Sequence, residues 1–190
     1  MRELKGFLKV LVATWTALIA VFHLYTAVFG IMQPRIQRGI HILFLLPLAF
    51  ILYPATKKSP TDRPSIPDFF LALLAMIPSL YVIIMNEPLN IRMPMVDPIS
   101  TLELWLGIVN ILLLIEAIRR VVVPAMAILV SLFFAYIFLA PYLSGIFYSR
   151  RVSLARIVEK TNLISDSGIY GSRTGVTATF VAIIVIFGSL

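Results

Sequence analysis

Glu103, Gly107 and Asn110 form the first pattern in this sequence whose residue types and spacing could do chemistry. They follow one another at i, i+4 and i+7, which places all three on one face of a helix. A charge in hydrocarbon costs at least about 2.5–3.5 kcal/mol on insertion scales, so an ionisable residue in an apolar segment suggests a function. This face could therefore bind an ion or a partner. The structural alternative places Glu103 at headgroup depth and has Asn110 bond a neighbouring helix.

A second charged group follows on the same predicted helix. Glu116, Arg119 and Arg120 fall at i, i+3 and i+4, so the carboxylate can pair with either guanidinium. We interpret the group as an anchor where the helix leaves the membrane, or as a contact to another domain.

The stretch GIYGSRTGVTATF places glycines beside small hydroxyl residues, directly before an apolar run. Glycines permit an unwound backbone, and freed carbonyls with short hydroxyls can line a site for an ion or a solute. Small residues are equally common where helices pack closely, so packing is the alternative. The candidate residues of a substrate or ion site are Gly171, Ser172, Gly175, Thr177 and Thr179.

No catalytic constellation is found in the sequence. It contains no phosphate-binding G-x-x-x-x-G-K-[ST], no H-E-x-x-H and no G-x-S-x-G. His23 and His41 are lone histidines without a carboxylate at ligand spacing, and each is expected to bond a neighbouring helix. Asp62 and Asp68 lie in the polar segment KKSPTDRPSIPD and are expected to be solvated. We therefore expect no enzymatic activity, no metal and no cofactor.

The elements that position these residues follow from an extreme composition. Hydrophobic residues make up 60% of the chain and charged residues 13%, against roughly 45–50% and about 25% in soluble domains. Too few charges remain for a water-soluble surface, so the sequence predicts an integral membrane protein. The net charge of +7 is assigned to loops beside the bilayer, because no basic run alternates with aromatic residues. The lipid bilayer is thus an expected partner, and nucleic acid is not.

Charge-free intervals predict where the chain crosses the membrane. A helix needs about 20 mainly apolar residues to span the hydrocarbon, with about 17 as the lower limit. The intervals are continuous rather than alternating, which favours helices over strands. We predict an all-α membrane protein with five complete spans and the beginning of a sixth, and kinks at Pro47, Pro78 and Pro124. The intervals are 10–34, 39–56, 69–86, 104–115 (extended to 102–118), 121–149 and 174–190.

The distribution of Lys and Arg predicts the orientation. With the N-terminus in the cytoplasm, eight basic residues lie on the inside of the first four spans. Three lie on the outside, namely Arg35, Arg38 and Arg92. The segment 150–173 then adds five on the nominal outside. Either the fifth span does not cross the membrane simply, or this segment does not set the topology. Its pattern favours the second alternative, because Ser153 could cap a short amphipathic helix with an apolar stripe that includes Ile157 and Val158. Such a helix is expected to lie in the membrane interface, with Glu159 on its polar face.

The sequence resembles a known family over essentially all 190 residues, and specifically from about Leu104 onward. The stretches LWLGIVNILLLIEAIRRVVVPAMAILVSLFFAYIFLAPYLSG, SLARIVEK and SDSGIYGSRTGVTATFVAIIVIFGSL are similar to the N-terminal part of a fused TRAP transporter permease (tripartite ATP-independent periplasmic transporter) of the TAXI type. In that family the last stretch has a Gly-rich approach and a Gly-Val-Ser-Ala-Thr-Phe-like helix start. Here it reads GVTATF, with Thr177 where Ser is usual and Arg173 where a hydrophobic residue is expected.

The resemblance implies a two-part permease. Residues 1–118 would form a four-helix, small-permease-like domain, and residues 119–190 the start of a large domain that moves solute by an elevator-type motion. A cation gradient, usually of Na⁺, drives that motion in the family. The implied partners are the remainder of the large domain and a periplasmic solute-binding protein, and the implied location is a bacterial or archaeal cell (inner) membrane.

The family also implies a limit on activity. Because such permeases build the solute site between internal repeats, the chain is expected to be a truncated or split product, or an excerpt, that lacks most of the site and does not transport alone. The alternative is a self-contained structural or scaffold membrane protein without transport activity.

Overall fold

The computed structural model describes residues 2–56 and 59–188, and the described part is helical with no strand. Five of its helices are long and apolar enough to cross a membrane, which confirms the predicted all-α class and the five complete spans. Four are single helices, and the fifth continues from α6 through a 3-10 turn to Tyr142. The spans are α1 (Gly6–Phe29), α2 (Pro34–Leu52), α3 (Ile66–Ile84), α5 (Thr101–Val121) and α6 (Pro124–Leu139).

The remaining elements are short. Residues 172–188, where a sixth span is predicted to begin, form one helical segment interrupted by a π turn; residues 189 and 190 of the prediction lie outside the described residues. A second π turn follows the helix that begins after Ser153. The elements are α4 (Asn86–Ile91), η2 (Gly145–Phe147), α7 (Leu154–Val158), η3 (Glu159–Leu163), α8 (Ser172–Val176), η4 (Thr177–Val181) and α9 (Ala182–Gly188).

Local sequence signals set where the long helices begin. Ser65 before α3 and Ser100 before α5 each form a capping box with the acidic residue three positions later, which satisfies backbone donors at the helix start. Pro124 is the first residue of α6, where its missing N–H costs nothing. Pro124 thus lies at the end of a span, whereas Pro47 and Pro78 lie inside α2 and α3.

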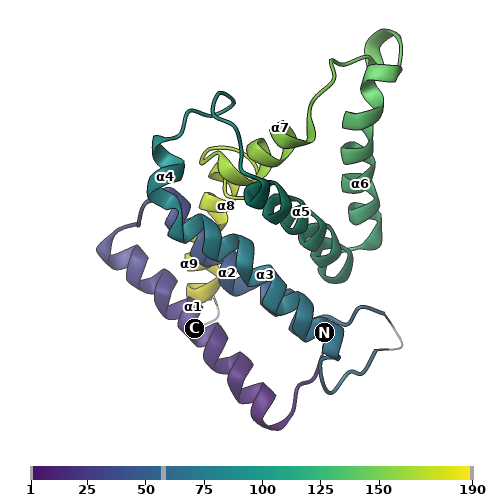
Figure 1. The fold of residues 1–190 in the computed structure, drawn as a ribbon. Helices are drawn as coiled ribbons and strands as arrows, with labels where there is room; N and C mark the ends of the chain where they lie inside the picture. Colours follow the sequence, from purple (N-terminus) through teal and green to yellow (C-terminus); the bar gives the residue numbers. More distant parts are fainter. Residues whose placement is uncertain (1, 57–58, 189–190) are drawn as a thin grey trace.

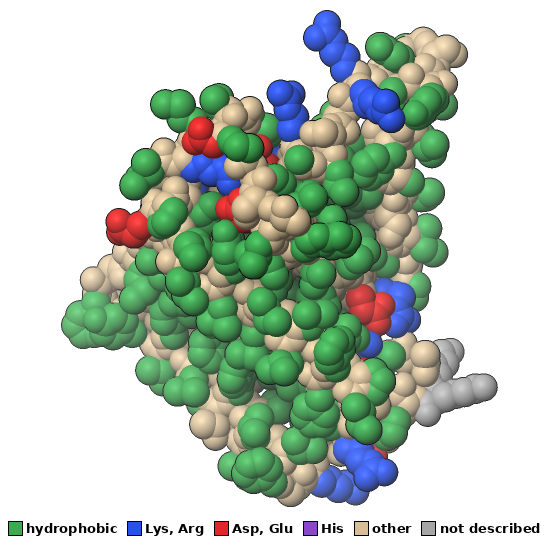
Figure 2. Space-filling model, viewed as in Figure 1, with side chains coloured by type: hydrophobic (Ala, Val, Ile, Leu, Met, Phe, Trp, Pro, Cys, Tyr) green, Lys and Arg blue, Asp and Glu red, His purple; other side chains and the backbone are tan. Residues whose placement is uncertain are grey.

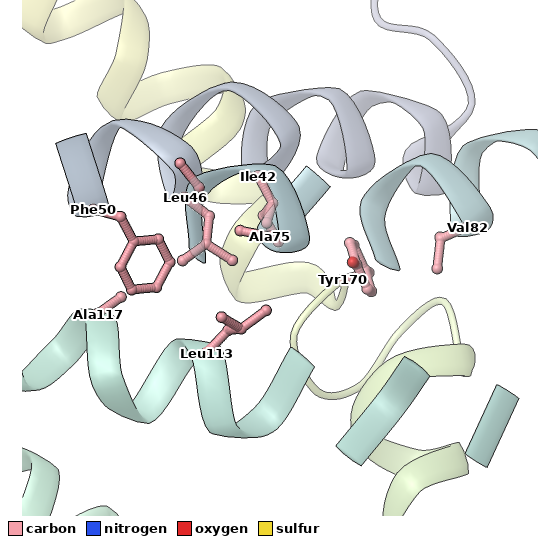
Figure 3. Close-up of a cluster of buried hydrophobic side chains, with 9 residues drawn as sticks. Ile42, Leu46, Phe50, Ala75, Val82, Leu113, Ala117 and Tyr170 are labelled. Atoms are coloured by element: carbon pink, nitrogen blue, oxygen red, sulfur yellow. The ribbon is translucent and has the colours of Figure 1, made fainter. Parts of the chain in front are cut away.

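The core lies where α2, α3 and α5 meet (Figure 3). Phe50 and Ala75 are fully buried, and Tyr170, from the loop before α8, is 1% exposed in the same cluster. The loop thus shares a core with three of the spans, so the predicted parts 1–118 and 119–190 pack against one another. The other buried members are Ile42, Leu46, Ala72, Val82, Leu113 and Ala117.

The outer helices leave this core less covered. α1 lies alongside α2, with α8 and α9 near both helices, and α6 stands out to one side after a short link from α5 (Figure 1). Figure 2 shows hydrophobic side chains over most of the visible surface, with Lys, Arg, Asp and Glu mainly toward its ends. A continuous apolar surface of this kind is typical of a protein surrounded by lipid.

Candidate functional site

A polar cluster lies inside the bundle near the middle of α5. Asn110 donates through Nδ2 to Asn162 Oδ1 at 2.8 Å and to the Tyr170 hydroxyl at 3.3 Å. The same hydroxyl lies 3.2 Å from Ser79 Oγ on α3. All four side chains are buried, and Asn110 Oδ1 has no hydrogen-bond partner among the described residues. We call Ser79, Asn110, Asn162 and Tyr170 the central cluster.

The central cluster depends on a close approach of η3 to α5. A Cβ atom placed on Gly107 would lie 2.3 Å from Val158 Cγ1 and 3.1 Å from Asn162 Nδ2. Since real contacts of this kind do not fall below about 3.0 Å, a side chain at this position would force Val158 or one of the helices to shift. Asn162 then donates to the carbonyl of Gly107 at 3.4 Å. The predicted face of Glu103, Gly107 and Asn110 is therefore one buried face of α5.

The loop from residue 164 to residue 171 is held from both sides. Arg38 on α2 donates through Nη1 to the carbonyl oxygens of Ser165 and Tyr170, at 2.5 and 3.0 Å. Gly168 has φ +67°, a conformation that side chains with a Cβ rarely adopt, and a Cβ there would lie 2.2 Å from the carbonyl oxygen of Thr161. Backbone that is not helical thereby finds partners inside the bundle.

Three of the five predicted site residues, Ser172, Gly175 and Thr179, line one cleft, but the threonine hydroxyls of this stretch are bonded locally. Thr177 donates to the carbonyls of Thr174 and Arg173, and Thr179 donates to the carbonyl of Gly175 at 2.8 Å. These hydroxyls are therefore bonded within their own helix. What the stretch does form is one wall of a cleft of ≈ 210 Å³ against α2, with Arg38, Ser172, Gly175 and Thr179 among its lining residues.

Two of the three glycines of this stretch, Gly171 and Gly175, serve close packing. A Cβ on Gly175 would lie 2.8 Å from Nε of Arg38, and one on Gly171 would lie 2.7 Å from the carbonyl carbon of Ser167. These approaches agree with the packing alternative for the small residues. A role in ion or solute binding stays a prediction.

Glu103 lies in an ion-pair network at the end of the bundle where α3 ends and α5 begins. Arg92 donates to both of its carboxylate oxygens at 3.2 Å, and Tyr81 donates to Oε1 at 3.1 Å. Glu159 lies 3.9 Å from Arg92 and accepts from the backbone N–H of Met95 at 2.9 Å. Arg92 thus links α5 with η3.

The predicted interfacial helix is correct in its cap, but Glu159 does not lie on an exposed polar face. Ser153 caps α7 by accepting from the N–H of Arg156, as expected. Ile157 and Val158 are buried, but Glu159 is only 4% exposed. Because Arg92 and the N–H of Met95 provide it with partners, this carboxylate points into the protein rather than into a solvated layer.

The opposite end of the bundle carries a second ion-pair network, and here one expectation is wrong. Asp68 is not a solvated loop residue: it is the third residue of α3 and fully buried. Arg2 and Arg120 each lie 2.6 Å from one of its carboxylate oxygens. Glu116 pairs with both Arg119 and Arg120 at 2.7 Å, as its spacing predicts. A buried carboxylate with two guanidinium partners needs no water.

His23 and His41 are not lone histidines. Nδ1 of His41 lies 3.1 Å from Nε2 of His23, which joins α1 to α2, and both side chains are buried. The expected bond to a neighbouring helix is therefore present, and its partner is the other histidine. Among the residues that the structure describes, no group of three or more His, Asp or Glu could hold a metal ion.

The arrangement suits binding more than bond-breaking. The central cluster offers neutral amides and hydroxyls, which can accept from or donate to a polar ligand but do not exchange protons near neutral pH. Sequence reasoning did not identify Ser79, Asn162, Tyr170 or Arg38, because their partners lie 52 to 132 residues away in the chain. Comparisons with protein-family models, with curated proteins and with solved structures found no match to this chain.

Proposed function

We propose that the chain forms part of the membrane permease of a TRAP-type secondary transporter, in which a cation gradient drives solute uptake. In this proposal α1, α2, α3 and α5 form the scaffold, and the segment from α6 onward begins the part that moves the solute. Na⁺ is the coupling cation, and a solute-binding protein delivers the solute from outside the cell.

The observation that carries the proposal is the interrupted helical segment from α7 to α9. Its loop reaches the middle of α5, where Tyr170 bonds Asn110 and Ser79. Non-helical backbone at membrane depth is tolerated only where it is buried in protein or lines a cavity. Secondary transporters build their solute sites from broken helices of this kind.

A second function, that of a static scaffold, is favoured by a different observation. Arg38 binds two carbonyls of the loop, Gly107 fits closely against Val158, and Arg92 lies between Glu103 and Glu159. These contacts fix the interrupted segment to α2 and α5. A segment fixed in this way would support a partner protein rather than move.

A reversible cross-link separates the two functions. The chain has no cysteine, so the double variant G107C/V158C carries one engineered pair at the contact between α5 and α7. The pair is expressed together with the rest of the proposed permease and with a solute-binding protein, and solute uptake into proteoliposomes is measured with and without a Na⁺ gradient.

The proposed transporter gives Na⁺-dependent uptake when the cysteines are reduced. If the segment moves during transport, oxidation abolishes uptake and reduction restores it. The matched control V158C, which keeps Gly107 and carries a single cysteine, shows no effect of oxidation. Absence of Na⁺-dependent uptake in the reduced, correctly folded assembly would exclude the proposed function and leave the scaffold.

A further inference from the structure

We propose that the groove between the first half of α1 and the α2–α3 pair binds one anionic phospholipid, with the phosphate at Lys5 and Lys9 and one acyl chain inside the groove. The inference does not depend on the proposed transport function. It rests on an apolar groove, on a basic cleft at its mouth and on the way α1 is attached.

The groove lies beside the half of α1 that is less firmly attached. His23 contacts His41, and Thr26 accepts a hydrogen bond from Gln37, so the last turns of α1 are bonded to α2. Toward the N-terminus the attachment is Trp15, whose indole N–H donates to the carbonyl of Phe44 at 3.0 Å. Beyond Trp15 the two helices leave room between them.

That room is apolar and large enough for part of an acyl chain. It encloses ≈ 190 Å³ and is lined by apolar side chains of three helices. An apolar cavity of about 150 Å³ suffices to bind benzene. The lining residues include Val12 and Trp15 on α1, Leu48 and Ile51 on α2, and Phe69 and Leu73 on α3.

A basic cleft lies at the mouth of this groove. It encloses ≈ 570 Å³, it shares Val12 with the groove, and Lys5 and Lys9 line it. Neither lysine forms an ion pair within the part of the chain that the structure describes. Glu3 also lines the cleft, and the two lysines outweigh its charge. Lys and Arg side chains gather at the lower edge of the molecule (Figure 2).

The guanidinium of Arg2 shows why these lysines are free to bind a ligand. Arg2 also lines the cleft, but its side chain is bonded to Asp68 and to the backbone carbonyls of Phe50, Ile51 and Pro60. The carboxylate of Asp68 is thus already occupied, which leaves Glu3 as the carboxylate that lines the cleft. Two free ammonium groups beside an apolar groove match a phospholipid. The lysines attract its phosphate, and the groove takes up its acyl chain.

Trp15 makes the proposal measurable, because it lines the groove and the chain contains only two tryptophans. The variant W105F leaves Trp15 as the sole indole. It is reconstituted with lipids brominated on the acyl chain, which quench tryptophan fluorescence on contact, and brominated phosphatidylglycerol is compared with brominated phosphatidylcholine at equal mole fractions. We expect phosphatidylglycerol to compete for the groove about five-fold or more better, since one lysine near the surface contributes about that factor.

Three variants make the test specific. Adding K5Q/K9Q to W105F is expected to bring the preference close to one, while R150Q/R151Q, a matched pair of exposed charges outside the groove, leaves it unchanged. The variant W15F, in which the exposed Trp105 is the sole indole, is expected to show no preference between headgroups.

Two results would overturn the proposal. Equal quenching of Trp15 by the two lipids would show that Lys5 and Lys9 do not select a headgroup. Absence of quenching by either lipid would show that another helix, from this chain or from a partner, closes the groove. Circular dichroism of each variant before reconstitution ensures that the comparison is made between folded proteins.

Discussion

The carboxylate of Asp68 and the guanidinium of Arg120 form a buried ion pair of 2.6 Å across 52 residues of sequence. Their side chains are 1% and 3% exposed. Arg2 binds the other carboxylate oxygen at the same distance. One aspartate therefore joins the N-terminal segment, the start of α3 and the end of α5.

Replacing Asp68 with Asn is expected to lower the free energy of unfolding by about 3–5 kcal/mol. The variant keeps the size of the side chain but leaves Arg2 and Arg120 buried without the carboxylate between them, and an uncompensated buried charge costs about this much. Thermal unfolding in detergent, followed by circular dichroism, measures the loss.

The matched control for this prediction is Glu116→Gln. Glu116 also binds Arg120, but its side chain is 28% exposed, so its loss is expected to cost within about 1 kcal/mol. Equal destabilisation by the two variants would mean that burial does not distinguish the two carboxylates.

Replacing Tyr170 with Phe is expected to destabilise the protein by about 1–3 kcal/mol. The variant keeps the ring in the core but removes the hydroxyl that bonds Ser79 and Asn110, so buried polar groups lose a partner. Tyr142→Phe, at a position that is 74% exposed, should unfold like the unmodified protein. If Tyr170→Phe leaves the free energy of unfolding unchanged, the central cluster does not hold the loop.

The contact between Gly107 and Val158 predicts a non-additive pair of variants. Gly107→Ala alone should cost about 1–3 kcal/mol, because its methyl group overlaps Val158 Cγ1. Val158→Ala removes the overlapping atom, so the double variant should be less destabilised than the sum of the two single variants. Unfolding measurements on all four proteins give the coupling, and strict additivity would contradict the close packing of α5 with α7 and η3.

Much of the fold could be predicted from the sequence because hydrocarbon imposes simple rules. Runs without charge mark helices of the required length, and the face of Glu103, Gly107 and Asn110 follows from helical spacing alone. The pairing of Glu116 with its two arginines is equally local. Each of these signals lies within a few residues of sequence.

The remaining features depend on contacts between distant segments. Asp68 lies in a polar, proline-rich stretch typical of a solvated loop, and its partners are 52 and 66 residues away. The bond between His23 and His41 requires the relative position of α1 and α2, which neither helix encodes by itself. Arg38 and Arg92, two of the three basic residues assigned to the outside, likewise bind protein groups. A charge count treats them as free, although protein groups already bind their guanidinium groups.

The last prediction concerns Met95, which has φ +65° in the loop between α4 and α5. An L-residue in this conformation costs roughly 1–2 kcal/mol, and glycine avoids that cost but loses about 0.5–1 kcal/mol through its greater freedom when unfolded. Met95→Gly should therefore be more stable than Met95→Ala by about 0.5–1 kcal/mol in thermal unfolding. The alanine variant is the proper reference because both changes remove the same half-exposed side chain. If the Met95→Ala and Met95→Gly variants are equally stable, Met95 does not hold a left-handed conformation. The hydrogen bond from its N–H to Glu159 would then be absent as well.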